Sequence, residues 1–293
     1  MSNTIPPPAP HARTLIVNAD DFGLSRSINL GIIECFKTGI VNSASLMVTM
    51  PGFEDALSHI REHPTLSVGL HVDLLRGEPL CGAPHPWHHW GRGRWRSSLR
   101  AKTAALFIDS TLRKTGWIER ETRAQIERAL RHGVTIRHLD SERNVHTFPP
   151  IFRLFVRLAM EYQIPRIRAI NEDFFYPRST TPSVQTGSFR RLMSTLLTRA
   201  AHFNRRYAAQ HGIGLNDHYF GFRESGTLSL DRLSSILKEL PQGITELGCH
   251  PGFIDDEWSR PPLCDHPFYL NGSRHQEVAL LTHPSLRELV SDV

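Results

Sequence analysis

The sequence is poor in lysine and cysteine and has no long apolar run. Lysine and arginine together number 34 but only four are lysines, so the net charge of +5 comes almost wholly from arginine. The cysteines stand far apart without a CxxC pair, which argues against a disulfide framework and for the reduced thiols of a cytoplasmic protein. No apolar stretch approaches the roughly 20 residues of a membrane-spanning helix.

Motifs for nucleic-acid binding are also absent. No helix-turn-helix, zinc-finger or RNP pattern is present, so we expect no nucleic-acid partner. The basic charge then reflects either an arginine-biased composition or a surface for an anionic partner such as acidic lipid. Residues 1–13 are proline-rich and lack the apolar stretch of a secretory signal, so we expect a disordered tail. Residues 14–293 are expected to form a single domain.

Short apolar runs alternate with helical stretches, which is typical of βα units around a parallel sheet or barrel. Seven runs are candidate strands: 14–18, 43–49, 67–74, 135–142, 166–170, 218–222 and 245–250. Candidate helices lie between them: 27–38, 52–63, 120–132, 150–162, 189–210 and 229–240. The pattern predicts an α/β fold, a deformed or incomplete (β/α) barrel of about seven parallel strands. A closing strand after the last helical stretch, 284–290, could be absent or trimmed, and a homodimer partner could then cover the open edge.

One insertion, residues 84–117, interrupts this alternation with tryptophan, histidine and arginine, and only 99–113 is loosely helical. Tryptophan beside arginine is favoured at membrane interfaces and at carbohydrate- or lipid-binding surfaces. The alternative is a long lid whose tryptophans cap the barrel. Since a segment this long without a strand is usually functional, we expect it to contact the substrate, with Trp87 as a candidate.

Two adjacent acids follow the first strand candidate, in Asn18-Ala19-Asp20-Asp21-Phe22-Gly23. The carboxyl ends of parallel strands are where α/β folds hold their chemistry. Successive strand residues face opposite sides, so Asp20 and Asp21 reach one site only if the strand ends between them. Gly23 allows that turn. The pair predicts two roles, one carboxylate binding a metal and the other moving protons.

Three further strand candidates end in polar residues that alternation places on one face. They are Gly69, His71 and Asp73, then His138, Asp140 and Glu142, and finally Gly248 and His250. Buried ionisable groups are costly unless they are paired or bound to metal, and Asp, Glu and His all bind divalent ions. A metal polarises a carbonyl, a free carboxylate can act as general base, and a histidine can protonate the leaving group. These parts predict a metal-assisted hydrolase of an amide or ester.

Six segments give the chain a resemblance to the YdjC-type carbohydrate deacetylases. They are LIVNADDFG at 15–23, GIIE at 31–34, GLH at 69–71, HLDS at 138–141, VH at 145–146 with FP at 148–149, and CHP at 249–251. The resemblance implies a deformed (β/α) barrel, one divalent metal, and removal of the N-acetyl group of an amino sugar.

The length, the arginine-rich character and the aromatic insertion look most like the hopanoid biosynthesis-associated branch of that family. This likeness implies an N-acetylglucosaminyl hopanoid, a glycolipid, as substrate. We expect a cytoplasmic protein, either free or peripheral at the inner face of the membrane. The alternatives are a deacetylase of soluble chito-oligosaccharides and a non-catalytic glycolipid-binding relative.

The resemblance also implies roles for individual residues. Asp21 and His71 fall on metal-ligand positions and Asp20 on that of the general base. The third family ligand is a histidine directly after Asp-Ser, where this chain has Glu142. Either Glu142 is the ligand, or His146 is and Glu142 orients it. Two carboxylates with one histidine would shift the preference from Zn²⁺ towards Mg²⁺ or Mn²⁺.

Four further residues at the strand ends are candidates for the remaining roles. His250 is expected to protonate the departing amine. Asp140 could bind substrate hydroxyls or orient His250, and Arg168 could hold His250 or a carboxylate and contact the substrate. Asp73 could orient His71, because metal-bound histidines usually need such a partner.

Overall fold

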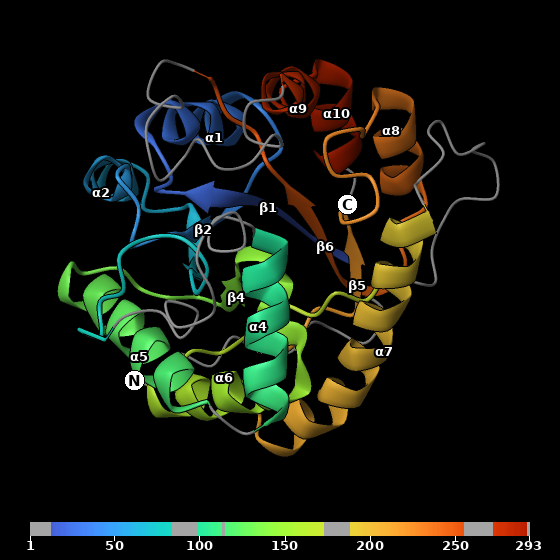
Figure 1. Cartoon of the computed structure of the whole chain (residues 1–293). Coiled ribbons are helices and arrows are strands. Elements are labelled where there is room, and N and C mark those ends of the chain that lie inside the picture. Colours follow the sequence, from blue (N-terminus) through green and yellow to red (C-terminus); the bar gives the residue numbers. More distant parts are fainter. Residues whose placement is uncertain (1–12, 84–98, 113–114, 173–187, 255–271, 292–293) are drawn as a thin grey trace.

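The computed structural model describes residues 13–83, 99–112, 115–172, 188–254 and 272–291. Six parallel strands form one curled sheet in these residues, in the order β4-β3-β2-β1-β6-β5 (Figure 1). The strands are β1 Arg13–Phe22, β2 Ser43–Leu46, β3 Ser67–Val72, β4 Leu139–Ser141, β5 His218–Phe220 and β6 Gly243–Cys249. The α/β half-barrel that the sequence predicts is therefore confirmed.

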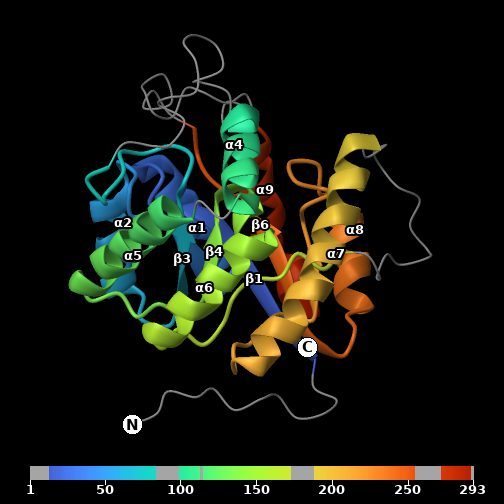
Figure 2. The same cartoon turned by 60° about the horizontal axis from the view of Figure 1, so that its bottom comes forward.

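Helices cover the outside of this curled sheet (Figures 1 and 2). They are α1 Arg26–Thr38, α2 Phe53–Glu62, α4 Leu99–Thr111, α5 Gly116–Arg131, the 3₁₀ segment η2 Glu142–Thr147, α6 Pro149–Glu161, α7 Ser188–Gln210, α8 Leu230–Lys238, α9 Ser273–Leu281 and α10 Pro284–Ser291. Local chemistry sets several of their starts. Ser25 and Ser229 accept backbone N–H groups at the starts of α1 and α8, each at 3.3 Å, and such caps contribute about 1 kcal/mol.

One of the seven predicted strands, at residues 166–170, is wrong, because the structure forms no strand there. It forms single parallel bridges, from Ile167 to Leu139 and from Arg166 to Gly214. The ladder does not continue because the Asn216 side chain takes up the next backbone groups. Its Oδ1 accepts the N–H of Ala169 and its Nδ2 donates to the carbonyl of the same residue, both at 2.7 Å.

This bridging segment nevertheless connects the two edges of the sheet. Its backbone bonds to Leu139 of β4 on one side, and Asn171 accepts the N–H of Tyr219 in β5 at 2.9 Å on the other. The open edge at which we expected a dimer partner is thus bridged within the chain. The homodimer itself stays a prediction.

The predicted insertion is only partly described. Its helical stretch is confirmed as α4, whereas Trp87 lies outside the described residues. Residues 1–12 of the predicted tail also lie outside them, and Arg13, which the prediction placed in the tail, begins β1. Two bonds hold α4 near the carboxyl ends of β3 and β4, where it stands in Figure 2. Lys102 donates to the carbonyl of Leu75 at 2.9 Å, and Arg143 donates to Thr103 at 3.1 Å. Among the helices that the structure describes, none is both long and apolar enough to cross a membrane.

Candidate active site

The two adjacent aspartates reach one site through an irregular end of β1. The strand runs on to Phe22 instead of ending near Asn18, and its register against β2 shifts between Ala19 and Phe22. Asp21 takes the left-handed conformation, with φ of 70°, which turns its side chain relative to that of Asp20. Gly23 follows with φ of 92°, and a Cβ there would lie only 2.6 Å from the carbonyl oxygen of Met47. The predicted turn thus begins at Asp21 and requires the glycine.

His71 lies between two carboxylates. Its Nδ1 donates to Asp140 Oδ1 at 2.8 Å, across the register pair that joins β3 to β4. Its Nε2 faces Asp21 Oδ1 at 3.7 Å. Burial lowers the pKa of His71, but Asp140 and the other aspartates outweigh it and raise the pKa to about 9. Nε2 is therefore a position that holds a proton or, in its place, a metal ion.

Asp21 also pairs with an arginine that sequence reasoning missed. The guanidinium of Arg274, at the start of α9, donates to Asp21 Oδ2, and both side chains are buried. Burial raises the pKa of Asp21, but Arg274 and His71 lower it to about 2. The carboxylate is thus ionised at neutral pH. No helix was predicted at 273–281, so the sequence carried no signal for Arg274.

Asp20 is fixed by Arg168, which lies in the bridging segment. The guanidinium donates to both carboxylate oxygens of Asp20, at 2.9 and 2.7 Å, and Asn18 donates to Oδ1 at 2.8 Å. Arg168 also pairs with Asp140 at 2.8 Å and with Glu246 at 2.6 Å. A planar guanidinium suits such paired contacts, so it holds these three carboxylates in fixed positions.

Glu246 could have been found from the sequence. It is an acid inside the β6 strand, at the same parity as Gly248 and His250. Burial lowers the pKa of Arg168, but Asp140, Asp20 and Glu246 raise it overall. The arginine therefore stays charged in the interior because these acids surround it.

Glu142, at the position of the family histidine, pairs with another arginine that was not anticipated. Arg76 Nε donates to Glu142 Oε1, and both groups are buried. Burial raises the pKa of Glu142, with Asp73 and Asp21 adding to the rise and Arg76 opposing it. The negative charges of Asp21 and Asp73 therefore act on Glu142, a repulsion that a bound cation would relieve.

Asp73 does not orient His71; Asp140 does. Asp73 instead holds the loop after β3, where its carboxylate accepts the backbone N–H groups of Leu75, Arg76 and Gly77, each at 2.9 Å.

His146 has both ring nitrogens engaged by the protein. Nε2 donates to the carbonyl of Arg168 at 3.1 Å, and Nδ1 accepts from the hydroxyl of Ser141 at 2.8 Å. The ring is fully buried against Phe155, and burial lowers its pKa to about 4. The imidazole is thus neutral and supports the backbone of Arg168.

His250, at the end of β6, lies on the solvent side of the pair formed by Asp20 and Arg168. Its Nε2 is 3.8 Å from Asp20 Oδ2, and its side chain is 21% exposed. Its backbone N–H donates to Glu277 at 2.5 Å. The ring can therefore exchange protons with Asp20 through a small movement or one water.

The site offers two sets of metal ligands that share His71. Among the described residues near β1, ligand atoms of Asp20, His71 and Asp140 all lie within 4.8 Å of one another. The set with Glu142 is not among the groups that satisfy this distance. Arg168 already occupies Asp20 and Asp140, however, and a second cation there would be repelled.

Asp21 and His71 fit a divalent ion better, because Arg274 binds Oδ2 of Asp21 and leaves Oδ1 facing His71. Two ligands at about 2.0–2.2 Å from one ion lie roughly 3–4 Å apart, which matches the 3.7 Å between Asp21 Oδ1 and His71 Nε2. Asp140 behind His71 supplies the orienting carboxylate that a metal-bound imidazole usually has.

Known proteins resemble this chain over nearly its whole length. The family model described as YdjC-like protein matches residues 14–292. A carbohydrate deacetylase of Geobacillus stearothermophilus is 33% identical over 275 residues, covering 94% of this chain and 91% of the relative. A chitooligosaccharide deacetylase of Proteus mirabilis is 30% identical over 282 residues, which cover 96% of this chain and 95% of the relative.

One crystal structure supports the fold alone. It is that of a protein from Enterococcus faecalis described as a cellobiose-phosphate cleavage protein. The match covers 96% of this chain and 94% of the Enterococcus chain, with a TM-score of 0.67 and 23% sequence identity.

Proposed function

This chain belongs to the YdjC-like family, and we propose that it hydrolyses the acetamido group of an N-acetylated amino sugar, releasing acetate. The observation that carries the proposal is the arrangement of Asp20, Asp21 and His71. One carboxylate and one imidazole face each other at ligand spacing, and the neighbouring carboxylate is locked in place by Arg168. The carbohydrate deacetylases among its relatives support the same chemistry.

We propose that Asp21 and His71 hold one divalent ion, with Glu142 as third ligand. A bound divalent ion would polarise the acetyl carbonyl and lower the pKa of a water molecule. Asp140 holds His71 so that Nε2 faces Asp21 and would be available to the ion. Arg76 pairs with the Glu142 carboxylate and offsets its charge. The identity of the metal, Mg²⁺, Mn²⁺ or Zn²⁺, is left to measurement.

Asp20 is proposed as the general base and His250 as the general acid. Arg168 and Asn18 fix the Asp20 carboxylate, so it can take a proton from a water molecule without reorienting. His250, 3.8 Å from Asp20, stands on the open side, where it can give a proton to the departing amine. Arg168 and Asp140 remain candidates for contact with sugar hydroxyls, as does Trp87 outside the described residues.

The experiment for this function is incubation of the purified protein with a panel of N-acetylated amino sugars. We expect free amine and acetate in equal amounts, detected by mass spectrometry. If no member of the panel loses its acetyl group in the presence of Mg²⁺, Mn²⁺ or Zn²⁺, a non-catalytic glycolipid-binding protein becomes the better interpretation.

Glu142 provides a prediction about the third ligand. Glu142→Ala should weaken metal binding roughly tenfold or more, because a charged ligand is lost, whereas Glu142→His should restore it with a shift towards Zn²⁺. Titration with Mn²⁺ and Zn²⁺ measures both effects. His146→Gln is the matched comparison, since an amide can keep one of the two hydrogen bonds of the ring. Loss of metal in His146→Gln with normal affinity in Glu142→Ala would make His146 the ligand.

We further propose that the amino sugar is carried on a lipid, an N-acetylglucosaminyl hopanoid, and that the enzyme works at the inner face of the membrane. The support is an apolar surface on α4, beside the carboxyl ends of β3 and β4. Phe107, Ile108 and Leu112 are exposed by 47%, 40% and 61%. Side chains of this kind favour partial insertion among lipid headgroups. A soluble chito-oligosaccharide substrate is the alternative, supported by the Proteus relative.

The lipid proposal predicts vesicle binding through α4. Replacing Ile108 and Leu112 together by aspartate should reduce binding to anionic vesicles at least tenfold, because apolar area is lost and negative charge is added. Leu130→Asp is the matched control. Leu130 is also an exposed apolar residue, at 41%, but it lies at the C-terminal end of α5, away from α4, so the variant should bind vesicles normally. Vesicle sedimentation measures the effect. Absence of binding by the unmodified protein, together with equal turnover of free and lipid-linked sugar, would contradict the proposal.

A further inference from the structure

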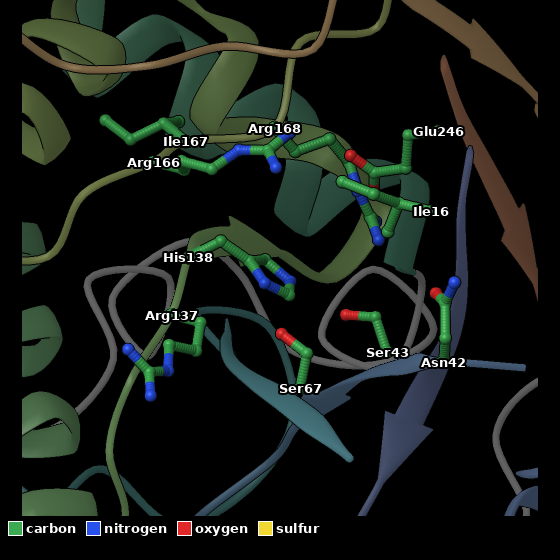
Figure 3. Close-up of a pocket in the computed structure, with 10 residues that line it drawn as sticks. All are labelled: Ile16, Asn42, Ser43, Ser67, Arg137, His138, Arg166, Ile167, Arg168 and Glu246. Atoms are coloured by element: carbon green, nitrogen blue, oxygen red, sulfur yellow. The ribbon is translucent and has the colours of Figure 1, made fainter. Parts of the chain in front are cut away.

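A polar cavity of about 260 Å³, drawn in Figure 3, is lined by residues near the amino ends of the strands, whereas the proposed catalytic site lies at their carboxyl ends. It is lined by residues from the starts of the strands and from the bridging segment: Ile16, Asn42, Ser43, Ser67, Arg137, His138, Arg166, Ile167, Arg168 and Glu246. Figure 3 shows Arg166, Arg168 and Glu246 on one side of the cavity and His138, Ser43 and Ser67 on the other. Arg168 also takes part in the proposed catalytic site, but neither the proposed function nor the relatives assign a role to the cavity itself.

Arg166 brings a positive charge to this cavity without a close partner. Its guanidinium forms no hydrogen bond and no ion pair within 4.0 Å among the residues described, although the side chain is half-buried. Arg168 on the same wall differs, because Asp20, Asp140 and Glu246 satisfy it. A guanidinium in a partly buried cavity favours an anion that can accept two parallel hydrogen bonds.

The opposite wall adds a donor and an acceptor. The hydroxyl of Ser67 has no hydrogen-bond partner in the described parts of the chain and can donate into the cavity. Ser45 gives its single hydroxyl proton to Asp140 at 2.8 Å, so His138 Nε2, at 3.0 Å, donates to Ser45. The other nitrogen of the neutral ring, Nδ1, is then an acceptor. Gly69 leaves room for this ring, because a Cβ there would lie 2.2 Å from it.

Glu246 adds a second acceptor. Its Oε1 accepts from Arg168 at 2.6 Å, and its Oε2 has no hydrogen-bond partner within the described residues. The cavity therefore presents a cation, a hydroxyl donor and two acceptors. A ligand that fills it must carry negative charge and also an O–H group.

We propose that this cavity is a binding site for a protonated phosphate group, held by Arg166 and Ser67 and recognised through Glu246 and His138. Inorganic phosphate near neutral pH carries one or two O–H groups, which can donate to these acceptors. Sulfate is similar in size and shape but has no O–H group at this pH, so the acceptors would repel it. A cation, Arg166, and an acceptor, Glu246, in one cavity thus predict selectivity between the two anions, because an acceptor left without a donor in a buried site is costly.

Titration calorimetry of the full chain with inorganic phosphate tests the proposal. We expect phosphate to bind and sulfate to bind at least roughly tenfold more weakly. Arg166→Gln should weaken phosphate binding roughly tenfold or more, and Arg166→Lys should weaken it less because the charge is kept. Arg199→Gln, on the exposed face of α7, is the matched control and should leave the affinity unchanged. Ser67→Ala provides a second variant in case Arg166→Gln does not fold.

Three further measurements test whether phosphate binds in this cavity and in what chemical form. Chelator-treated protein and the His71→Ala variant should bind phosphate as well as the untreated protein, since the cavity lies at the other end of the barrel. N-acetylglucosamine 6-phosphate, compared with N-acetylglucosamine, shows whether the phosphate group is free or sugar-borne. Equal binding of sulfate, loss of binding in His71→Ala, or unchanged affinity in both Arg166→Gln and Ser67→Ala would each overturn the proposal.

Discussion

Replacing His71 by alanine is expected to abolish both bound metal and deacetylation without unfolding the protein, and Asp21→Asn should do the same. The two side chains face each other at 3.7 Å, and each contributes one ligand atom to the proposed ion. Losing either leaves fewer protein ligands than catalytic metal sites usually have. Elemental analysis of the purified variants, with circular dichroism to check the fold, measures the effect.

This experiment needs a control for a second possible metal site at the surface. His59, Glu62 and His63 on and beside α2 also lie within 4.8 Å of one another, so they could add metal to the elemental count. His59→Ala should therefore leave activity unchanged whatever it does to the total metal. If His71→Ala and Asp21→Asn both keep full metal content in a His59→Ala background, the proposed ligand pair is wrong.

Asp20→Asn is expected to lower turnover by about 10²–10⁴-fold while the protein keeps its metal, because positioned proton transfer contributes about that much. The amide cannot accept a proton, yet it keeps the size and position of the carboxylate. Arg168 would still pair with Asp140 and Glu246, so the interior should stay folded. Single-turnover kinetics measure the rate of deacetylation, and elemental analysis of the same sample measures the metal content.

The opposite result has a definite meaning. Asp20, His71 and Asp140 form the other group of ligand atoms, so loss of metal in Asp20→Asn would make Asp20 a ligand. A matched comparison is Asp217→Asn, which changes a carboxylate outside the site that pairs with Arg205 at 3.1 Å. That variant should keep both metal and turnover.

The strand ends could be predicted from the sequence because alternation and the shared carboxyl edge of a parallel sheet are local rules. They led to Asp20, Asp21, His71 and Asp140, which the fold brings together. Two of the arginines that neutralise the site, Arg76 and Arg274, could not be predicted in this way. Arg274 reaches Asp21 across 253 positions of the chain, and no periodic pattern links two residues at that distance.

The count of strands was wrong for a related reason. Residues 166–170 alternate arginine with apolar residues as a strand can, and they do lie beside β4. Their ladder stops because one side chain, Asn216, bonds to the backbone of Ala169 at both its N–H and its carbonyl. Such a substitution of side chain for backbone depends on tertiary structure, so composition does not reveal it. The left-handed Asp21 is a similar case, since glycine at 23 predicted a turn but not its first residue.

Hydrolysis in ¹⁸O-labelled water tests the proposed chemistry most directly. The metal-loaded protein is incubated with an N-acetylglucosaminyl lipid and with soluble chito-oligosaccharide, and the products are analysed by mass spectrometry. If Asp20 activates water for attack on the acetyl carbonyl, the released acetate carries one labelled oxygen and the sugar gains a free amine without label. Asp20→Asn should then slow the release of acetate and of the amine equally. Acetate without label, or no acetate from either substrate, would contradict the assignment of this site as a hydrolytic deacetylase.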